Sequence, residues 1–327
     1  MTRAAAPGTM AGMKLRATTP APWEVDVEST VRDHLYGERA EARAAPIRRG
    51  MPTVLCGRYR LLERLGSGGA ADVYRAHDER LRRDVAVKLI IESLARDSAA
   101  VRRFRREAEL GARLAHPNIA AVLDAGSRPR DYMVMELVDA RDAGTLLEQD
   151  HALTSRHAVE VVVQICDALE HAHGRGVIHG DVTPRNILVG VRDGTAKLVD
   201  FGLAVDRFGV WRPGEIMGTP GYVAPEIARG GGPSPQSDVY SLAVVAYRLL
   251  GGPPALRPRS GLDTAARPSA IASLRPLAEV RPDLRPELTA IVGSAIGRDP
   301  RARPGSAAEF RDRLLEARTG PAELRAA

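Results

Sequence analysis

The sequence predicts an α+β fold in which strands come first along the chain and helices follow. Three segments, 58–65, 85–90 and 132–137, have the short, bounded pattern that is typical of strands. Two later segments, 155–173 and 237–250, carry apolar residues at helical spacing over several turns. With 327 residues, the chain is long enough either for two lobes with substantial cores or for one large domain plus a tail.

Composition narrows the class of protein. Cys56 and Cys166 form no Cys-x-x-Cys pair, which argues against a disulfide framework or a zinc site. No apolar run reaches the roughly 20 residues of a membrane span, and the N-terminus lacks the apolar core of a secretory signal. We therefore expect a soluble, cytoplasmic protein.

Charge and residue usage give two further expectations. The net charge of +6 comes from scattered arginines, and only 4% of residues are aromatic, so compositional bias is favoured over nucleic-acid binding. Of the 47 basic residues only Lys14, Lys88 and Lys197 are lysine. In so arginine-rich a chain, a lysine inside a motif is informative.

The N-terminal residues 1–56 differ from the rest of the chain. They are rich in Ala, Arg and Pro and show no sustained strand pattern, so we expect a loosely ordered extension. Apolar residues at four-residue spacing allow one short helix near 25–42, and docking to a partner is a weaker alternative. The expected divisions are a domain at 57–316, with lobes at about 57–136 and 139–316, and a short tail at 317–327.

The polar loop 179–186, His-Gly-Asp-Val-Thr-Pro-Arg-Asn, stands between an amphipathic segment and an apolar run. Asp181 and Asn186, on one short turn, are suited to orient a hydroxyl nucleophile and to bind Mg²⁺. A second short strand at 196–199 leads to Asp200-Phe201-Gly202, and a hairpin between the two strands would bring Asp200 beside Asn186 as a second metal ligand. Taken alone, these residue types are also ordinary in turns.

A glycine-rich segment at 66–73 joins two predicted strands earlier in the chain. Its backbone N–H groups can approach phosphates because no side chains block them, although a plain hairpin is the alternative. The apolar strand at 85–90 contains Lys88, for which a surface lysine is the alternative. A helical stretch at 99–114 then supplies two neighbouring acids, Glu107 and Glu109.

These motifs, taken together and in this order, resemble the catalytic core of protein kinases: Gly-x-Gly-x-x-Gly-x-Val with Ala71 at the third glycine, Val-Ala-x-Lys, His-x-Asp-x4-Asn and Asp-Phe-Gly. The resemblance implies a bilobal protein-kinase-like fold with a small, mainly β N-lobe and a larger, mainly α C-lobe. It also implies ATP and Mg²⁺ as cofactors, with Asp181 as the catalytic base and Lys88 on the phosphates. Glu107, or Glu109 as the fallback, would pair with Lys88.

The resemblance continues to about residue 316. The stretch 218–226 is similar to the end of a kinase activation segment, and Arg303 lies in a late motif in which it would pair with Glu226. Met135 would stand at the back of the adenine pocket. The metal would be held by Asn186 and Asp200. The residues that the resemblance places around the nucleotide are Leu65, Gly66, Ser67, Gly68, Gly69, Val73, Ala86, Lys88, Glu136, Val138 and Leu188.

Three functional classes share this fold. The His-Gly-Asp triplet also occurs in small-molecule phosphotransferases of the aminoglycoside and choline kinase type, whereas the stretch 218–226, Asp238 and Arg303 are features of protein kinases. A pseudokinase scaffold is disfavoured because the core motif residues are all retained. The whole most resembles the eukaryotic-like Ser/Thr kinases of bacteria, which implies protein substrates, and Thr219 in Gly-Thr-Pro-Gly-Tyr favours Ser/Thr acceptors.

Two departures from the family pattern predict unusual properties. Thr183 stands where Ser/Thr kinases usually place a lysine, and we hypothesise that Arg185 substitutes for it as a transition-state cation; a surface arginine is the alternative. Gly180 replaces an arginine that pairs with a phosphorylated loop in most regulated members, and 203–217 contains no Ser, Thr or Tyr. The sequence therefore predicts activity without activation-loop phosphorylation.

Overall fold

The computed structural model describes residues 54–150, 153–202, 204–206, 218–252 and 274–323, all of which belong to one unit, Glu38–Ala327. The expected helix near 25–42 and most of the stretch 203–217 lie outside the described residues. Among the described residues, no helix is long and apolar enough to cross a bilayer.

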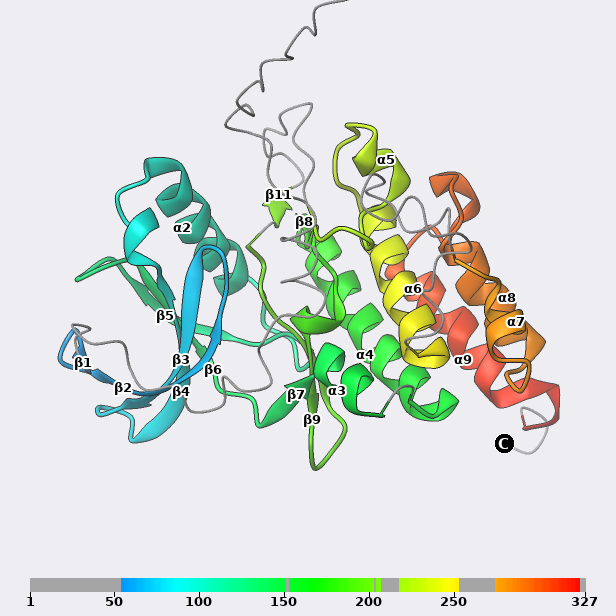
Figure 1. Cartoon of the computed structure of the whole chain (residues 1–327), viewed down its shortest axis with the longest axis horizontal. Coiled ribbons are helices and arrows are strands. Elements are labelled where there is room, and N and C mark those ends of the chain that lie inside the picture. Colours follow the sequence, from blue (N-terminus) through cyan, green and yellow to red (C-terminus); the bar gives the residue numbers. More distant parts are fainter. Residues whose placement is uncertain (1–53, 151–152, 203, 207–217, 253–273, 324–327) are drawn as a thin grey trace, which may run out of the picture. The chain divides into compact units, whose positions relative to one another are not determined.

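The N-lobe is built on a six-stranded antiparallel sheet (Figure 1). The order across the sheet is β1-β2-β3-β4-β6-β5, so each strand lies next to its neighbour in sequence except where β6 comes between β4 and β5. The strands are β1 (Val54–Leu55), β2 (Tyr59–Ser67), β3 (Ala71–Asp78), β4 (Arg83–Ile90), β5 (Val122–Gly126) and β6 (Tyr132–Glu136).

Both faces of this sheet bury apolar side chains because successive residues of a strand point to opposite sides. On one face, Tyr74 and Val87 belong to a cluster of buried residues from β1, β2, β3, β4 and β6. On the other face, Phe104 of helix α2 (Ser98–Ala112) packs against Ile90 and Met133. Helix α2 begins at the N-cap Asp97, which accepts hydrogen bonds from two backbone N–H groups. A 3₁₀ turn, η1 (Glu92–Leu94), precedes it.

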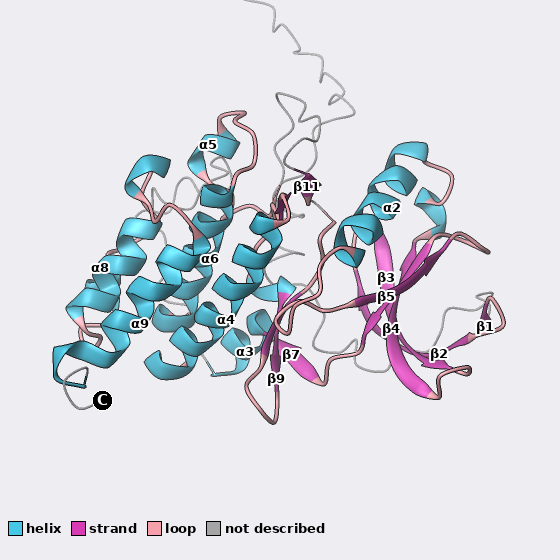
Figure 2. Cartoon of the chain, turned by 180° about the vertical axis from the view of Figure 1, so that it is seen from behind, coloured by secondary structure: helices cyan, strands magenta, loops and turns pink. Residues whose placement is uncertain are grey.

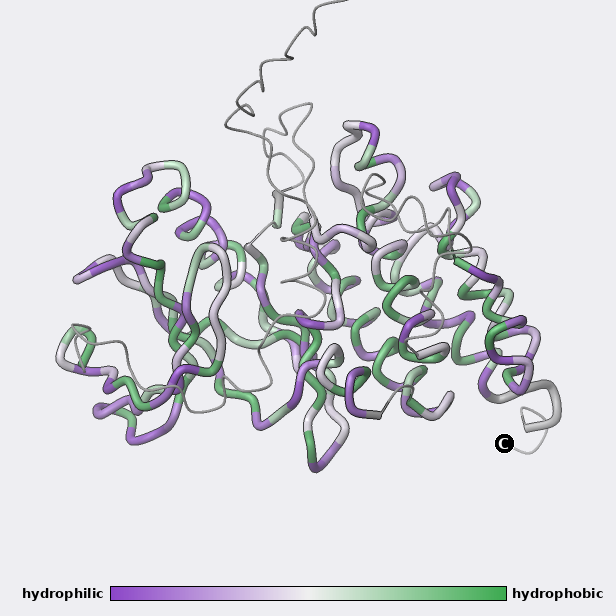
Figure 3. Tube along the Cα trace, in the orientation of Figure 1, coloured by the Kyte–Doolittle hydropathy of each residue, from purple (hydrophilic) through white to green (hydrophobic). Residues whose placement is uncertain are grey.

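The C-lobe is mainly helical, and Figure 2, which colours helices and strands differently, shows most of the helices gathered there. Its helices are α3 (Ala143–Asp150), α4 (Ser155–Gly174), α5 (Pro225–Ala228), α6 (Pro235–Gly251), α7 (Leu277–Val280), α8 (Pro286–Ala295) and α9 (Ala307–Glu323). Helix α6 is buried along most of its length because α4, α8 and α9 pack against it. Its mainly apolar sequence suits this central position. The trace coloured by hydropathy shows hydrophobic stretches along these central helices (Figure 3).

Short strands and turns connect the helices and carry the polar loops. They are β7 (Ala140–Asp142), β8 (Val177–Ile178), β9 (Ile187–Gly190), β10 (Ala196–Leu198), β11 (Val205–Asp206), η2 (Pro184–Asn186) and η5 (Pro300–Ala302). The predicted hairpin is present, since β9 and β10 pair antiparallel. The bilobal α+β architecture expected from the sequence is therefore confirmed.

The structure differs from the expected boundaries at both ends of the domain. Leu55, assigned to the extension, is fully buried and pairs with Tyr59, because the sheet needs β1 to cover its edge. At the other end, α9 continues to Glu323, past the expected domain end at 316, and Ala317, assigned to the tail, is buried. A third difference is β7, which pairs with β9 in a stretch that the sequence left unassigned.

Candidate active site

The polar loop after β8 is held by one buried carboxylate, Asp238 at the start of α6. Its two oxygens accept the backbone N–H groups of His179 and Gly180, each at 2.9 Å, and His173 Nε2 lies 2.8 Å away. Burial by itself would raise the pKa of Asp238, but the hydrogen bond from His173 and the surrounding donors outweigh it and hold that pKa below its usual range. Gly180 has a φ of 75°, which glycine adopts without strain.

Asp181 is fixed from two sides. Its Oδ1 accepts both the backbone N–H of Thr219 at 2.8 Å and the hydroxyl of Thr219 at 2.7 Å. Asn186 Nδ2 donates to the backbone oxygen of Asp181 at 2.9 Å and to Oδ2 at 3.3 Å. The structure thus brings together three residues that the sequence predicted, and it ties the loop to the segment that begins at Gly218.

Asp200 reaches the same region through the β9–β10 hairpin. The backbone N–H of Val199 donates to the oxygen of Asn186 at 2.9 Å, so Asp200 directly follows the residue paired with Asn186. Asp200 has a positive φ of 65° and is 46% exposed. This arrangement agrees with the predicted proximity of Asn186 and Asp200.

Lys88 of β4 joins the two lobes by ion pairs. Its Nζ lies 2.6 Å from Glu107 Oε1 and 2.9 Å from Asp200 Oδ1. Burial would lower the pKa of Lys88, but the carboxylates of Asp200 and Glu107 outweigh it and raise that pKa, so Lys88 is cationic. Burial raises the pKa of Glu107 to about 7, and Lys88 offsets this only in part.

The partner of Lys88 is therefore Glu107, and the fallback Glu109 is exposed. The pattern of α2 itself contains the signal. Ala100, Phe104, Ala108 and Gly111 form a buried stripe at helical spacing, and residue 107 lies on that stripe.

Asn186 and Asp200 each have an oxygen atom that can bind a metal ion. Asn186 uses its amide nitrogen to hold Asp181, so the amide oxygen is the atom that it can offer a cation. The exposed part of the Asp200 carboxylate can offer a second oxygen. Mg²⁺ in phosphate sites is usually held by one or two such protein ligands, with phosphate oxygens and waters completing its shell, so these two residues fit the ion.

The glycine-rich turn between β2 and β3 lies at the end of the sheet face that carries Lys88. Gly66 is paired with Val73, and Val73 with Lys88, so these positions form one row across three strands. A Cβ added at Gly66 or Gly69 would meet no atom within 4 Å. Packing within the chain therefore does not explain these glycines, whereas close approach of a ligand to the backbone does.

The other expected nucleotide residues lie near this face or near the connection between the lobes. Ala86 pairs with Met135, which lines a pocket together with Glu107 and Asp200. Leu65 is exposed. Val138, in the connection between β6 and β7, and Leu188, in β9, are both half-buried. Ser67, whose hydroxyl donates to Asp72 Oδ1 at 2.6 Å, and Gly68, whose N–H donates to the oxygen of Ala71 at 2.9 Å, shape the turn.

Glu136, one of the residues expected around the nucleotide, ends β6 at the connection between the lobes, which we call the hinge, and it makes a contact that the sequence analysis missed. Its carboxylate lies 3.1 Å from Lys197 Nζ, which also donates to the backbone oxygen of Pro117 at 2.7 Å. Lys197 is one of the three lysines in the chain, and that rarity was the available signal. The pair links the hinge strand to β10, the strand that precedes Asp200.

Among the described residues, Arg185 makes no hydrogen bond or ion pair with Asp181, and its guanidinium contacts β7 and α3 instead. It bonds Asp142, Thr145 and Glu148, at 3.2, 3.0 and 2.5 Å. In this geometry the guanidinium charge is paired with the carboxylates of Asp142 and Glu148, and the expected role as a transition-state cation stays a prediction. The alternative, a surface arginine, also stays open, but it has to include these contacts, since the side chain is only 22% exposed.

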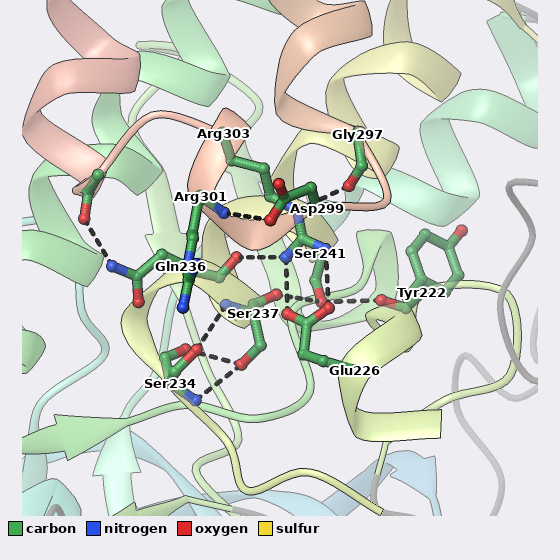
Figure 4. Close-up of polar contacts among 11 residues, drawn as sticks. Tyr222, Glu226, Ser234, Gln236, Ser237, Ser241, Gly297, Asp299, Arg301 and Arg303 are labelled. Carbon is green, nitrogen blue, oxygen red and sulfur yellow. Dashed lines mark hydrogen bonds and ion pairs between the residues drawn. The ribbon is translucent and has the colours of Figure 1, made fainter. Parts of the chain in front are cut away.

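The segment 218–226 is anchored to the C-lobe core by Arg303, as Figure 4 shows. The guanidinium is fully buried, donates to both oxygens of Glu226 at 2.7 Å, and donates to the backbone oxygen of Gly297 at 2.8 Å. The hydroxyl of Ser241 donates to the backbone oxygen of Tyr222 at 2.8 Å. These bonds fix the segment that reaches Asp181 through Thr219.

The site thus combines a fixed carboxylate, a lysine held by two acids, two candidate metal ligands and an exposed glycine turn, which are the parts expected of a phosphoryl-transfer site. The sequence model of the protein kinase domain family matches residues 59–314, and the chain belongs to the protein kinase family. The matched range agrees with the predicted extent of the resemblance.

Individual relatives are bacterial Ser/Thr kinases. The chain is 39% identical over 280 residues to the serine/threonine-protein kinase PknB of Mycolicibacterium smegmatis, covering 83% of this chain and 44% of PknB. It is 38% identical over 274 residues to PknA of Mycobacterium tuberculosis, covering 81% and 62%. The crystal structure of the PknI kinase domain of Mycobacterium tuberculosis superposes with a TM-score of 0.63 at 31% identity, over 81% of this chain and 98% of that one. The chain spans less than two thirds of the length of PknB and PknA.

Proposed function

We propose that this chain is an ATP-dependent serine/threonine protein kinase in which Asp181 is the catalytic base. The observation that carries the proposal is the double hydrogen bond from Thr219 to Asp181 Oδ1. It ties the base to the segment 218–226, which we expect to hold a polypeptide acceptor next to it. A small-molecule phosphotransferase has no need of this connection, so the contact favours a protein substrate.

Each group has a distinct task in the proposed reaction. Asp181 accepts the proton of the acceptor hydroxyl as the new oxygen–phosphorus bond forms and the bond between the γ-phosphorus and ADP breaks. Lys88, kept cationic by Glu107 and Asp200, binds the α- and β-phosphates. Bound Mg²⁺, held by Asn186 and Asp200, supplies charge neutralisation on the phosphates. The rate gain comes mainly from positioning and from fixed charge.

The test is transfer of phosphate from Mg-ATP to a protein acceptor. Asp181→Asn is expected to lower kcat by about 10²–10⁴-fold while ATP affinity stays within a few-fold, because the base acts on the acceptor. Asp193→Asn, in the exposed β9–β10 turn, is the matched control. Equal transfer by the Asp181→Asn and wild-type proteins would contradict the proposal, and ATP binding without any transfer by the wild type would indicate a pseudokinase.

Gly180 supports the further proposal that activity does not depend on activation-loop phosphorylation. Its N–H is engaged by Asp238, and it offers no charge to a loop phosphate. Phosphatase-treated enzyme is therefore expected to phosphorylate an added substrate as fast as untreated enzyme. A large loss of rate that autophosphorylation restores would contradict this. A cytoplasmic location stays a prediction from cysteine usage.

A further inference from the structure

The guanidinium of Arg185 is enclosed by acceptors from one short stretch of chain. Nη1 donates to Asp142 Oδ1 at 3.2 Å and to the hydroxyl of Thr145 at 3.0 Å, and Nη2 donates to Glu148 Oε1 at 2.5 Å. The Arg185 side chain is only 22% exposed. Three acceptors on β7 and α3 therefore hold one side chain of the polar loop 179–186, the proposed catalytic loop.

Two of these acceptors, Asp142 and Thr145, are ordered independently of Arg185. Asp142 accepts the N–H of Thr145 at 3.0 Å and its hydroxyl at 2.7 Å, so it already caps the first turn of α3. A Cβ at Gly144 would lie 2.9 Å from Asp142 Oδ1 and 3.0 Å from Arg185 Cδ. Only glycine at this position lets the arginine stem reach its partners without displacement.

Arg185 and Asn186 are neighbours in the single turn η2 (Pro184–Asn186). Asn186 is at once the metal ligand and the residue whose amide holds Asp181. On the far side of Asn186, Leu188 pairs with Asp142 in the β7–β9 ladder. The turn is thus attached to the same short stretch, 142–148, on both sides of Asn186, and a rotation of the turn would move the metal ligand.

We propose that Arg185 is a positioning residue that ties the catalytic loop to α3 and so sets the orientation of Asn186 toward the metal ion. The inference rests on the proposed function. It replaces the expected role at the transition state with an indirect one. A displacement of about 1 Å in a reacting group can lower a rate by about 10²-fold, so such a link affects turnover more than stability.

The two roles predict opposite results for the partners on α3. If Arg185 positions Asn186, then Glu148→Gln and Thr145→Val, which leave Arg185 in place but weaken its attachment, reproduce part of the Arg185→Ala defect. If Arg185 acts directly on the transferring phosphate, these variants release its charge and leave the rate unchanged or higher. Arg185→Lys is expected to be intermediate, because an ammonium cannot reach three acceptors with a planar fork.

The experiment measures the Mg²⁺ dependence of both turnover and ATP affinity, the latter by calorimetry. Arg185→Ala is expected to lower kcat by about 10–100-fold and to raise the Mg²⁺ concentration for half-maximal ATP binding by at least about threefold. Glu148→Gln and Thr145→Val are expected to shift that concentration in the same direction. Arg192→Ala is the matched control, since Arg192 is 90% exposed and lies 4.0 Å from Asp139.

Each outcome decides the proposal. A lower kcat in Arg185→Ala with an unchanged Mg²⁺ requirement, or unaffected Thr145→Val and Glu148→Gln proteins, would overturn it. If the Arg185→Ala protein shows no cooperative thermal unfolding and is therefore not folded, the Thr145→Val and Glu148→Gln proteins alone decide the proposal. If the wild type binds Mg-ATP but transfers no phosphate to proteins, the proposed function fails while the calorimetric test of Arg185 still stands.

Discussion

Two buried carboxyl groups, one in each lobe, have pKa values shifted in opposite directions. Asp238 in the C-lobe is 1% exposed and Glu107 in the N-lobe is 5% exposed. Asp238 receives two backbone N–H groups and His173, and its pKa is lowered. Glu107 shares a single lysine with Asp200, and burial raises its pKa to about 7.

The difference shows how the two lobes use charge. The His173 side chain, together with fixed backbone donors, outweighs the burial of Asp238, so this carboxylate stabilises a rigid loop. Glu107 is compensated by one long side chain, Lys88, which we propose also binds phosphates, so the N-lobe contact is adjustable. We infer that the C-lobe network mainly supports folding and that the Lys88–Glu107 pair mainly supports nucleotide use.

The largest effect is expected from Asp238→Ala. It leaves the N–H groups of His179 and Gly180 unsatisfied in the core, so the free energy of unfolding should fall by about 3–5 kcal/mol. Urea denaturation measures this loss of stability. Asp283→Ala serves as the control, because the Asp283 side chain is 61% exposed and pairs with Arg281 at the surface. Equal midpoints for the two variants would remove the distinction between the lobes.

Glu107→Gln should have the reverse profile. A neutral amide suits this buried position, so the free energy of unfolding should change by less than about 1 kcal/mol, whereas kcat/KM for ATP should fall by about 10–100-fold because Lys88 loses an anchor. Glu109→Gln, an exposed acid on the same helix, is the matched control. A Glu107→Gln protein that loses stability but not catalysis would reverse the comparison.

A smaller, pH-dependent effect follows from the same carboxyl. As the pH falls from 8 to 6, Glu107 takes up a proton and kcat/KM for ATP should fall by a few-fold. Because the pKa of Glu107 is higher in the folded than in the unfolded state, protonation favours the fold, so this group's contribution to stability grows over that range. The contribution of Asp238, whose pKa is lowered, is present near neutrality and is lost only in acid. Identical pH profiles of wild type and Glu107→Gln would contradict the assignment.

The smallest effect is expected from Lys197→Met at the connection between the lobes. The pair with Glu136 is partly exposed and contributes about 1 kcal/mol or less, so stability should barely change. Because Lys197 Nζ also holds the oxygen of Pro117, its loss should loosen the hinge and raise the KM for ATP by about two- to fivefold. Steady-state kinetics with varied ATP measure this, and an unchanged KM would leave the lysine with a structural role only.

Local sequence determined much of this protein. The β9–β10 hairpin, the glycine turn and the helices α4 and α6 follow from residue patterns within a few positions of one another, because turn chemistry and apolar periodicity act over such distances. The motif order alone was enough for the family and for Lys88, Asp181, Asn186 and Asp200 as candidates. Helix periodicity even contained the choice of Glu107 over Glu109.

Only the tertiary structure decided what these local pieces touch. Arg185 stands next to Asn186 in sequence, yet its partners are about 40 residues away, at Asp142 and Glu148. The short strands β1 and β7 have too few residues for a periodic pattern, and they form because Tyr59 and Leu188 offer them an edge to pair with. A long charged side chain finds the best-placed counter-charge in three dimensions, and its position in a motif does not specify that partner.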